Sequence, residues 1–220
     1  MIKRIINKIV RLFKIYIMKD EFLSAHNRWL VDNGDETLRV DYELDSDSIV
    51  FDLGGYKGDF ADIIYKKYEC TIYVFEPVEE FYLHIKNRFK DNPKINVFQF
   101  GLSNKDDNME INVSNDSSSV FKTDGKQEII KLQAISDFLE KNNIIKIDLF
   151  KINIEGGEFD ILPELIKINY IKNISNLQIQ FHNFIHNAEE KRNIIRTKLL
   201  KTHKEMYNYY FIWEGWSLND

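Results

Sequence analysis

Strand-like and helix-like segments alternate along the chain from residue 48 onward, and this alternation restricts the fold more than any other feature. Apolar runs at 48–54 and 71–77 are each followed by a segment with apolar residues at helical spacing, at 59–68 and 78–93. Such an order is typical of βαβ units, in which parallel strands form a sheet that helices cover on both faces. We therefore predict an α/β fold with a doubly wound, mostly parallel sheet.

The alternation continues to the end of the chain with one interruption. A third strand at 95–103 is followed by residues 104–131, which read as short extended pieces around turns and look like an insertion. The remaining expected elements are helices at 135–143, 157–166 and 188–205, strands at 147–153 and 177–182, and a hairpin at 207–218 that turns at Gly215. Because the chain has 220 residues and no segment that reads as an interdomain linker, we predict a single globular unit.

Residues 1–18 have the pattern of a basic amphipathic helix, with an apolar face that includes Ile2, Ile9 and Phe13 and an opposite face of Lys and Arg. Two interpretations stay open. The helix docks peripherally on an anionic membrane surface, or its apolar face packs on the domain and its charges are solvated. We divide the chain into 1–47, which holds this helix and a lead-in, and 48–220, the main domain.

Charge and cysteine content narrow the class of protein. Residues 1–19 carry six of the 30 basic residues and no acid, so the remainder has 24 basic residues against 35 acidic ones. An acidic body argues against nucleic acid as a partner. Cys70 is the single cysteine, which excludes an internal disulfide and fits a reducing compartment. We predict a cytoplasmic protein, located at the inner face of the membrane if the N-terminal helix binds lipid.

Three glycines, Gly54, Gly55 and Gly58, lie within five positions directly after the first predicted strand. In a parallel sheet this turn brings backbone N–H groups and a helix N-terminus towards a ligand, and glycine permits close backbone approach. A tight turn with no ligand is the alternative. Glu76 ends the second strand about 20 residues further on, where a carboxylate can accept hydrogen bonds from both hydroxyls of a ribose. This pairing favours a nucleoside-bearing cofactor.

The segments VFDLGGYKGDFA, VFEP, FGLSN, LFKINIEGGEFDIL and LQIQFHNF together resemble the FkbM family of S-adenosylmethionine-dependent methyltransferases. The resemblance covers residues 48–216. It implies a Rossmann-like class I methyltransferase domain with a seven-stranded sheet, an antiparallel last strand and S-adenosyl-L-methionine as cofactor. It also implies cofactor-binding residues: Asp52, Gly54 and Gly58 around the methionine moiety, Glu76 at the ribose, and Gly101, Leu102 and Ser103 beside the adenine. We also expect Gly55 of the same turn to contact the cofactor.

The fourth strand departs from the family's pattern K-I-D-x-E-G-x-E, because Asn153 stands at the position of the first acid. Asparagine keeps hydrogen bonding but carries no charge, so we place Asn153 in the cofactor site and predict no metal. Independently of the family, Lys151, Asn153 and Glu155 share one face of a strand near the sheet centre. They form either a structural network or part of the active crevice. We expect Asn153 and Glu155 in the crevice and Lys151 in a structural role.

His182 lies just beyond the fifth predicted strand, beside the expected end of the fourth. A hydroxyl is a poor nucleophile unless a base removes its proton, and His182 is our first candidate for that base, with Glu155 second. A structural histidine is the alternative. The resemblance implies an O-methyltransferase, and the C-terminal segments look like family members of bacterial surface-glycan and lipopolysaccharide biosynthesis. We expect a sugar or glycan acceptor, with a nicotinamide-dependent oxidoreductase and a non-catalytic cofactor-binding protein as alternatives.

Overall fold

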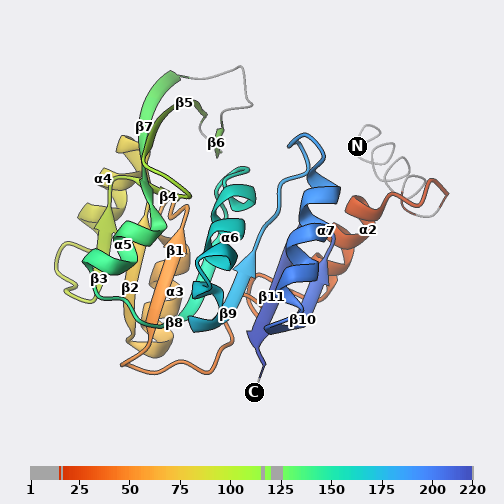
Figure 1. The fold of residues 1–220 in the computed structure, drawn as a ribbon, viewed down its shortest axis with the longest axis horizontal. Helices are drawn as coiled ribbons and strands as arrows, with labels where there is room; N and C mark the ends of the chain where they lie inside the picture. Colours follow the sequence, from red (N-terminus) through yellow and green to blue (C-terminus); the bar gives the residue numbers. More distant parts are fainter. Residues whose placement is uncertain (1–14, 16, 115–116, 120–125, 220) are drawn as a thin grey trace, which may run out of the picture.

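The computed structural model describes residues 15, 17–114, 117–119 and 126–219, which form a sheet covered by helices and a second, smaller sheet (Figure 1). Most of the predicted N-terminal amphipathic helix lies outside the described residues, so both of its interpretations stay open. In the described part of the chain, no helix has the length and apolar character that crossing a membrane requires.

The main sheet has seven strands in the order β10-β11-β9-β8-β1-β2-β3. Their bounds are β1 Ile49–Leu53, β2 Thr71–Phe75, β3 Ile95–Phe98, β8 Ile147–Ile152, β9 Ile174–Ile179, β10 His203–Tyr209 and β11 Trp213–Leu218. Parallel pairing joins β1 to β2 and β8, β2 to β3, and β8 to β9, whereas β11 is antiparallel to β9 and β10. The predicted doubly wound sheet with an antiparallel last strand is therefore confirmed.

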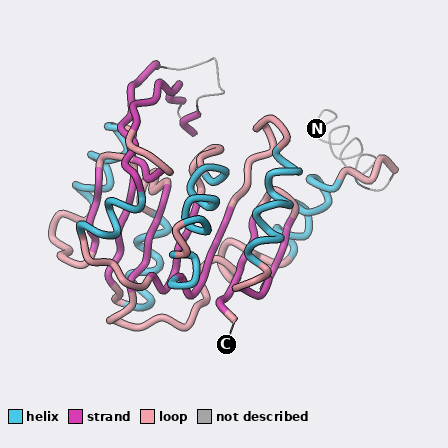
Figure 2. The backbone as a smooth tube through the Cα atoms, in the orientation of Figure 1, coloured by secondary structure: helices cyan, strands magenta, loops and turns pink. Residues whose placement is uncertain are grey.

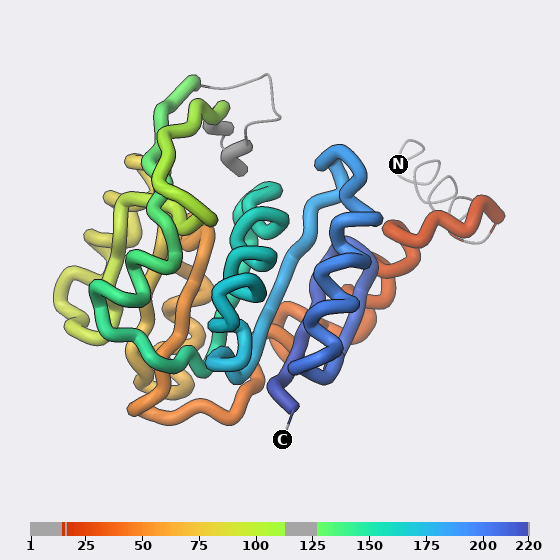
Figure 3. Tube along the Cα trace, in the orientation of Figure 1, coloured from red at the N-terminus to blue at the C-terminus, as the bar shows by residue number. Residues whose placement is uncertain are grey.

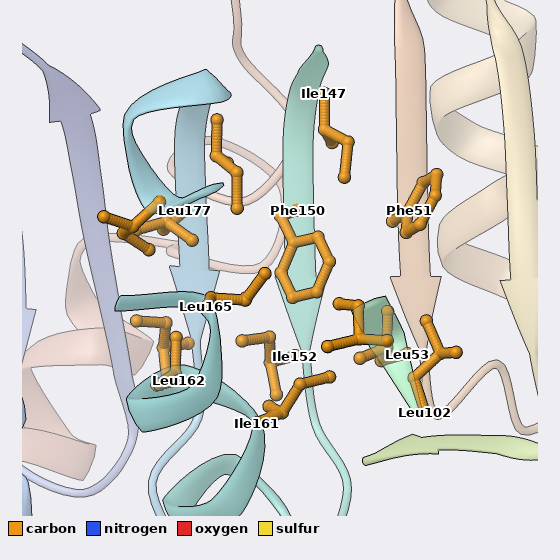
Figure 4. Close-up of a cluster of buried hydrophobic side chains, with 14 of the residues drawn as sticks. Phe51, Leu53, Leu102, Ile147, Phe150, Ile152, Ile161, Leu162, Leu165 and Leu177 are labelled. Atoms are coloured by element: carbon orange, nitrogen blue, oxygen red, sulfur yellow. The ribbon is translucent and has the colours of Figure 1, made fainter. Parts of the chain in front are cut away.

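Helices cover both faces of this sheet (Figure 2). One face carries α2 Glu21–Val31, α3 Asp59–Tyr68 and α4 Glu79–Arg88, and the other carries α5 Ile135–Lys141, α6 Glu158–Lys167 and α7 Ala188–Leu199. Figure 4 shows Phe150 of β8 beside Leu165 of α6, and Phe51 on the neighbouring β1 belongs to the same buried cluster. Each such buried side chain contributes about 1.5–3 kcal/mol, and burial on both faces explains the continuous apolar runs of β1 and β8.

The predicted insertion at 104–131 belongs to a four-stranded sheet of order β4-β7-β5-β6 that begins before it and ends after it. Its strands are β4 Gly101–Ser103, β5 Asp107–Ser114, β6 Ser117–Ser119 and β7 Lys126–Ala134. The third predicted strand, 95–103, was therefore wrong as one element, because β3 ends at Phe98 and the chain crosses into the second sheet. A Cβ on Gly101 would lie 2.9 Å from Leu132 Cδ2, so a larger residue here would have to displace that side chain. The second sheet rises above the carboxyl ends of β1 and β2 (Figure 1).

The C-terminal region differs from the sequence prediction in three places. Strand β9 begins at Ile174 rather than at 177, helix α7 ends at Leu199 rather than at 205, and the final hairpin turns at 210–212. Gly215 lies inside β11 opposite Tyr207, where a Cβ would lie 2.2 Å from the tyrosine ring. Charged residues in β10, and a register shift between Glu205 and Tyr207, hide the alternation expected of a strand.

Helix α2 lies against the C-terminal strands, and residues 32–47 lead from it to the start of β1 (Figure 3). Trp29 is 3% exposed and packs edge-on against Tyr209 with ring centroids 5.0 Å apart. Gln178 Nε2 donates hydrogen bonds to Arg39 O at 2.9 Å and Tyr42 Oη at 2.7 Å. These contacts hold residues 21–42 on the main sheet, and the division of the chain at residue 47 stays a prediction.

Candidate active site

A pocket of about 410 Å³ lies at the carboxyl ends of the parallel strands, between the second sheet and the start of α6. Strands β1 and β8 are neighbours here, and the strand order reverses between them, which is the usual place for a ligand in an open α/β sheet. The volume falls within the range of about 300–1,000 Å³ for small-molecule sites. Seven of the predicted site residues line this pocket: Gly54, Glu76, Gly101, Leu102, Ser103, Asn153 and Glu155.

Each of the three glycines in the turn after β1 lies where a side chain would meet a neighbouring atom. Gly54 has φ +79°, and a Cβ there would lie 2.0 Å from Asn153 O, so only glycine lets the turn approach the end of β8. Gly58, with φ +80°, is the N-cap of α3 and lies beside the ring of Phe89, and Gly55 packs on Val74. Of the three, Gly54 lines the pocket, whereas contact of Gly55 and Gly58 with a cofactor stays a prediction.

Asp52 is fully buried beneath the turn and outside the pocket lining. Lys151 Nζ lies 2.6 Å from Asp52 Oδ1 and also donates to Leu53 O at 3.2 Å and Gly54 O at 2.8 Å. Burial lowers the pKa of the Lys151 ammonium, and the charge of Asp52 acts in the opposite direction. Lys151 thus fixes the turn, as expected of a structural lysine, and a direct contact of Asp52 with the cofactor stays a prediction.

Glu76 follows β2 and is 5% exposed, with its carboxylate at the pocket wall. Its Oε2 accepts the N–H of Tyr56 at 2.8 Å and its Oε1 that of Val78 at 3.0 Å. Burial raises the pKa of Glu76 to about 7, while these two backbone bonds and the charge of Lys151 oppose the shift. Each oxygen keeps a further lone pair, so the carboxylate can also accept two vicinal ribose hydroxyls. The residues present therefore fit a nucleoside.

An apolar wall opposite the glycine turn was not predicted from the sequence. It consists of Leu102 of β4, Met109 and Ile111 of β5, and Ile130 and Leu132 of β7. The β5 and β7 side chains pack with Val78 and Phe81 at the start of α4. The signal was present as period-two alternation at 109/111 and 130/132, which places each pair on one face of its strand. An apolar wall beside Gly101–Ser103 suits a planar aromatic base, which agrees with the predicted adenine position.

His182 lies beside the pocket rather than in its lining and is 9% exposed. Its Nδ1 lies 3.0 Å from Glu158 Oε1, and its Nε2 lies 3.9 Å from Oε1 of Glu155, which does line the pocket. The structure therefore brings both candidate bases together. Glu158, which is fully buried, was not assigned a role from the sequence, although it is the last acid of the strand-four motif.

The described residues contain no cluster of three or more His, Cys, Asp or Glu side chains that could hold a metal ion. Asn153 lines the pocket, and its backbone N–H donates to Leu53 O at 3.1 Å, which joins the ends of β8 and β1. The absence of a metal stays an expectation for the whole chain.

A doubly wound sheet with an antiparallel last strand, and a pocket that joins a glycine turn to a strand-end carboxylate, define a class I methyltransferase that uses S-adenosylmethionine. Residues 52–211 match the family model of the methyltransferase FkbM domain, and the chain belongs to this family. The nicotinamide-dependent oxidoreductase and the non-catalytic protein are therefore no longer alternatives. No curated protein is significantly similar to the chain in sequence.

Solved structures are similar to this chain at low sequence identity. A Clostridium thermocellum protein, assigned provisionally to the rRNA methylases, is 8% identical with a TM-score of 0.51, over 87% of this chain and 96% of that one. An rRNA methylase from Streptococcus thermophilus is 11% identical with a TM-score of 0.46, over 80% and 90%. A Streptococcus mutans protein, provisionally a methyltransferase and solved with S-adenosylhomocysteine, is 10% identical with a TM-score of 0.46, over 85% and 94%.

Proposed function

We propose that this methyltransferase acts on a hydroxyl oxygen, with His182 as the base that accepts the hydroxyl proton. The observation that carries the proposal is the placement of His182 Nε2, 3.9 Å from Glu155 Oε1 at the pocket edge, while Nδ1 is held by Glu158. An alcohol is a weak nucleophile and needs such a base as the new bond forms, whereas an unprotonated amine is nucleophilic without one.

The residues of this chain divide the pocket into two parts. Glu76 and the turn at Gly54 hold the nucleoside and methionine moieties, and the apolar wall of β5 and β7 encloses the base. When bound, S-adenosylmethionine supplies an electrophilic methyl group. Glu155 lines the other part and His182 lies beside it; both orient the acceptor hydroxyl, and His182 takes up its proton.

The residues around this second part support a sugar as acceptor. Phe159, Asp160 and Lys191 line the pocket there, with Lys191 Nζ 5.9 Å from the centre of the Phe159 ring. Burial raises the pKa of Asp160, and the charge of Lys191 opposes this shift. An aromatic face together with hydrogen-bond donors and acceptors suits a ring that carries several hydroxyls. The net charge of −5 disfavours a polyanion such as RNA, and we propose a cytoplasmic role in surface-glycan biosynthesis.

The test is methyl transfer from labelled S-adenosylmethionine to a panel of sugars, nucleotide sugars and bacterial glycans, with ribosomal RNA as the competing class. A gain in product mass and fragmentation that places the methyl group on oxygen would support the proposal. Transfer to RNA or to nitrogen would contradict it.

Variants of the base refine the test. His182→Ala should lower turnover about 10²- to 10⁴-fold while S-adenosylhomocysteine affinity stays unchanged, since proton transfer contributes in that range. His84→Ala, an exposed histidine of α4, is the matched control. Full turnover of His182→Ala would reject His182 as the base, and Glu155→Gln would then test the second candidate.

A further inference from the structure

Glu158 is the first residue of α6, and its carboxylate is fully buried. Oε2 accepts the Gly156 N–H at 2.9 Å, and Oε1 accepts the backbone N–H of His182 at 2.9 Å and lies 3.0 Å from His182 Nδ1. A buried carboxylate is stable only when donors satisfy it, and two of its three contacts come from His182. The position of this histidine is therefore tied to Glu158.

These contacts determine which ring nitrogen of His182 carries the proton. A carboxylate oxygen can only accept, so Nδ1 is the protonated nitrogen, and in the neutral ring the lone pair is on Nε2. Nε2 lies 3.9 Å from Glu155 Oε1, which also only accepts. A hydroxyl oxygen about 2.8 Å from Nε2 can donate its single proton to this lone pair.

We propose that Glu158 is a positioning residue that holds His182 in the Nδ1–H form, so that the lone pair of Nε2 receives the proton of the acceptor hydroxyl beside Glu155. This inference rests on the proposed function, because it needs His182 to be the base. The acceptor oxygen forms a bond to the methyl carbon, the electron pair of the broken carbon–sulfur bond stays on sulfur, and the hydroxyl proton moves to Nε2. The resulting imidazolium donates to Glu158 and lies beside Glu155, so two carboxylates stabilise its charge.

A purely structural role of Glu158 is the competing explanation, because its bond to Gly156 closes the turn before α6. The two explanations differ in what happens to the ring when the carboxylate is removed. Without Glu158, nothing holds the proton on Nδ1, and the Nε2–H form becomes favoured because it can donate towards Glu155. A purely structural role predicts loss of stability with no change of tautomer.

The tautomer can be measured by nuclear magnetic resonance on ¹⁵N-histidine-labelled protein, without knowledge of the acceptor. The chain has five histidines, and His182→Gln identifies the signals of this ring. We expect the Nδ1–H form in the wild type and in Glu155→Gln, and a change to Nε2–H in Glu158→Met. Glu164→Gln is the matched control on the same helix, because Glu164 pairs with Lys167 at 3.0 Å.

The wild-type measurement keeps the proposal testable even if Glu158→Met fails to fold, because an Nε2–H ring in the wild type overturns it. An unchanged tautomer in folded Glu158→Met also overturns it. With an acceptor in hand, Glu158→Met should lose turnover about 10²- to 10⁴-fold, as His182→Ala does. If His182→Ala keeps its turnover, the proposed function fails as well; if only Glu158→Met keeps both turnover and tautomer, the inference alone fails.

Discussion

The affinity for S-adenosylhomocysteine should increase as the pH rises through about 7, and Glu76 is the cause. Burial raises the pKa of this carboxyl from its usual 4.5 to about 7, so below that pH the free protein holds a proton on Glu76. Ribose hydroxyls that donate to the carboxylate favour its charged form and lower its pKa in the complex. Binding below pH 7 must therefore release a proton, which weakens the apparent affinity.

The magnitude follows from the shift. If the complex keeps Glu76 charged throughout, the affinity at pH 6 should be about tenfold weaker than at pH 8, equal to about 1.4 kcal/mol. In Glu76→Gln, which cannot titrate, the difference between the two pH values should disappear. The affinity of this variant at pH 8 should also fall by about 2 kcal/mol, the size of a hydrogen bond to a charged group.

Isothermal titration calorimetry at several pH values between 6 and 8 measures both effects, and buffers of different ionisation enthalpy count the released proton. Glu80→Gln, an exposed neighbour on α4, serves as the matched control and should behave as the wild type. An equal affinity at pH 6 and pH 8 in the wild type, or the same pH dependence in Glu76→Gln, would refute the placement of Glu76 at the ribose.

Three further predictions concern stability and the N-terminal segment. Lys151→Met should lower the free energy of unfolding by about 3–5 kcal/mol in urea melts, because it leaves Asp52 charged and buried, and adding Asp52→Asn should restore part of the loss. Gly54→Ala should lower the melting temperature and abolish S-adenosylhomocysteine binding, since its Cβ would lie 2.0 Å from a backbone oxygen; normal binding would contradict this. Removal of residues 1–18 should leave that binding unchanged, and vesicle flotation with and without anionic lipid would show whether the segment binds membranes.

The central strands could be predicted because their signal is local. Phe51 and Phe150 belong to continuous apolar runs that are buried on both faces, and Gly54 marks the turn that follows the first of them. The same holds for Glu76, whose distance from the turn depends only on the length of one helix and one strand. Site residues that follow directly from strand ends were therefore accessible to sequence reasoning.

The remaining features depend on contacts between distant segments. Gly101 leaves the main sheet because it pairs with Leu132, 31 positions away, and nothing near Gly101 records that partner. Glu158 is an ordinary acid in the first turn of a helix until His182, 24 positions later, folds onto it. Such pairings are decided by the packing of the whole domain, so a local pattern predicts the elements and not these partners.

The contacts between the segment before β1 and the C-terminal strands determine the order in which the domain can assemble during synthesis. Arg39 lies 139 positions before its partner Gln178, and at about 5–20 residues per second the ribosome needs about 7 to 28 seconds to make that stretch. Trp29 must wait longer still, since Tyr209 belongs to the last hairpin. The apolar side of α2 is therefore uncovered during most of translation, and a chain that stops before β10 leaves that side exposed to aggregation or to a chaperone.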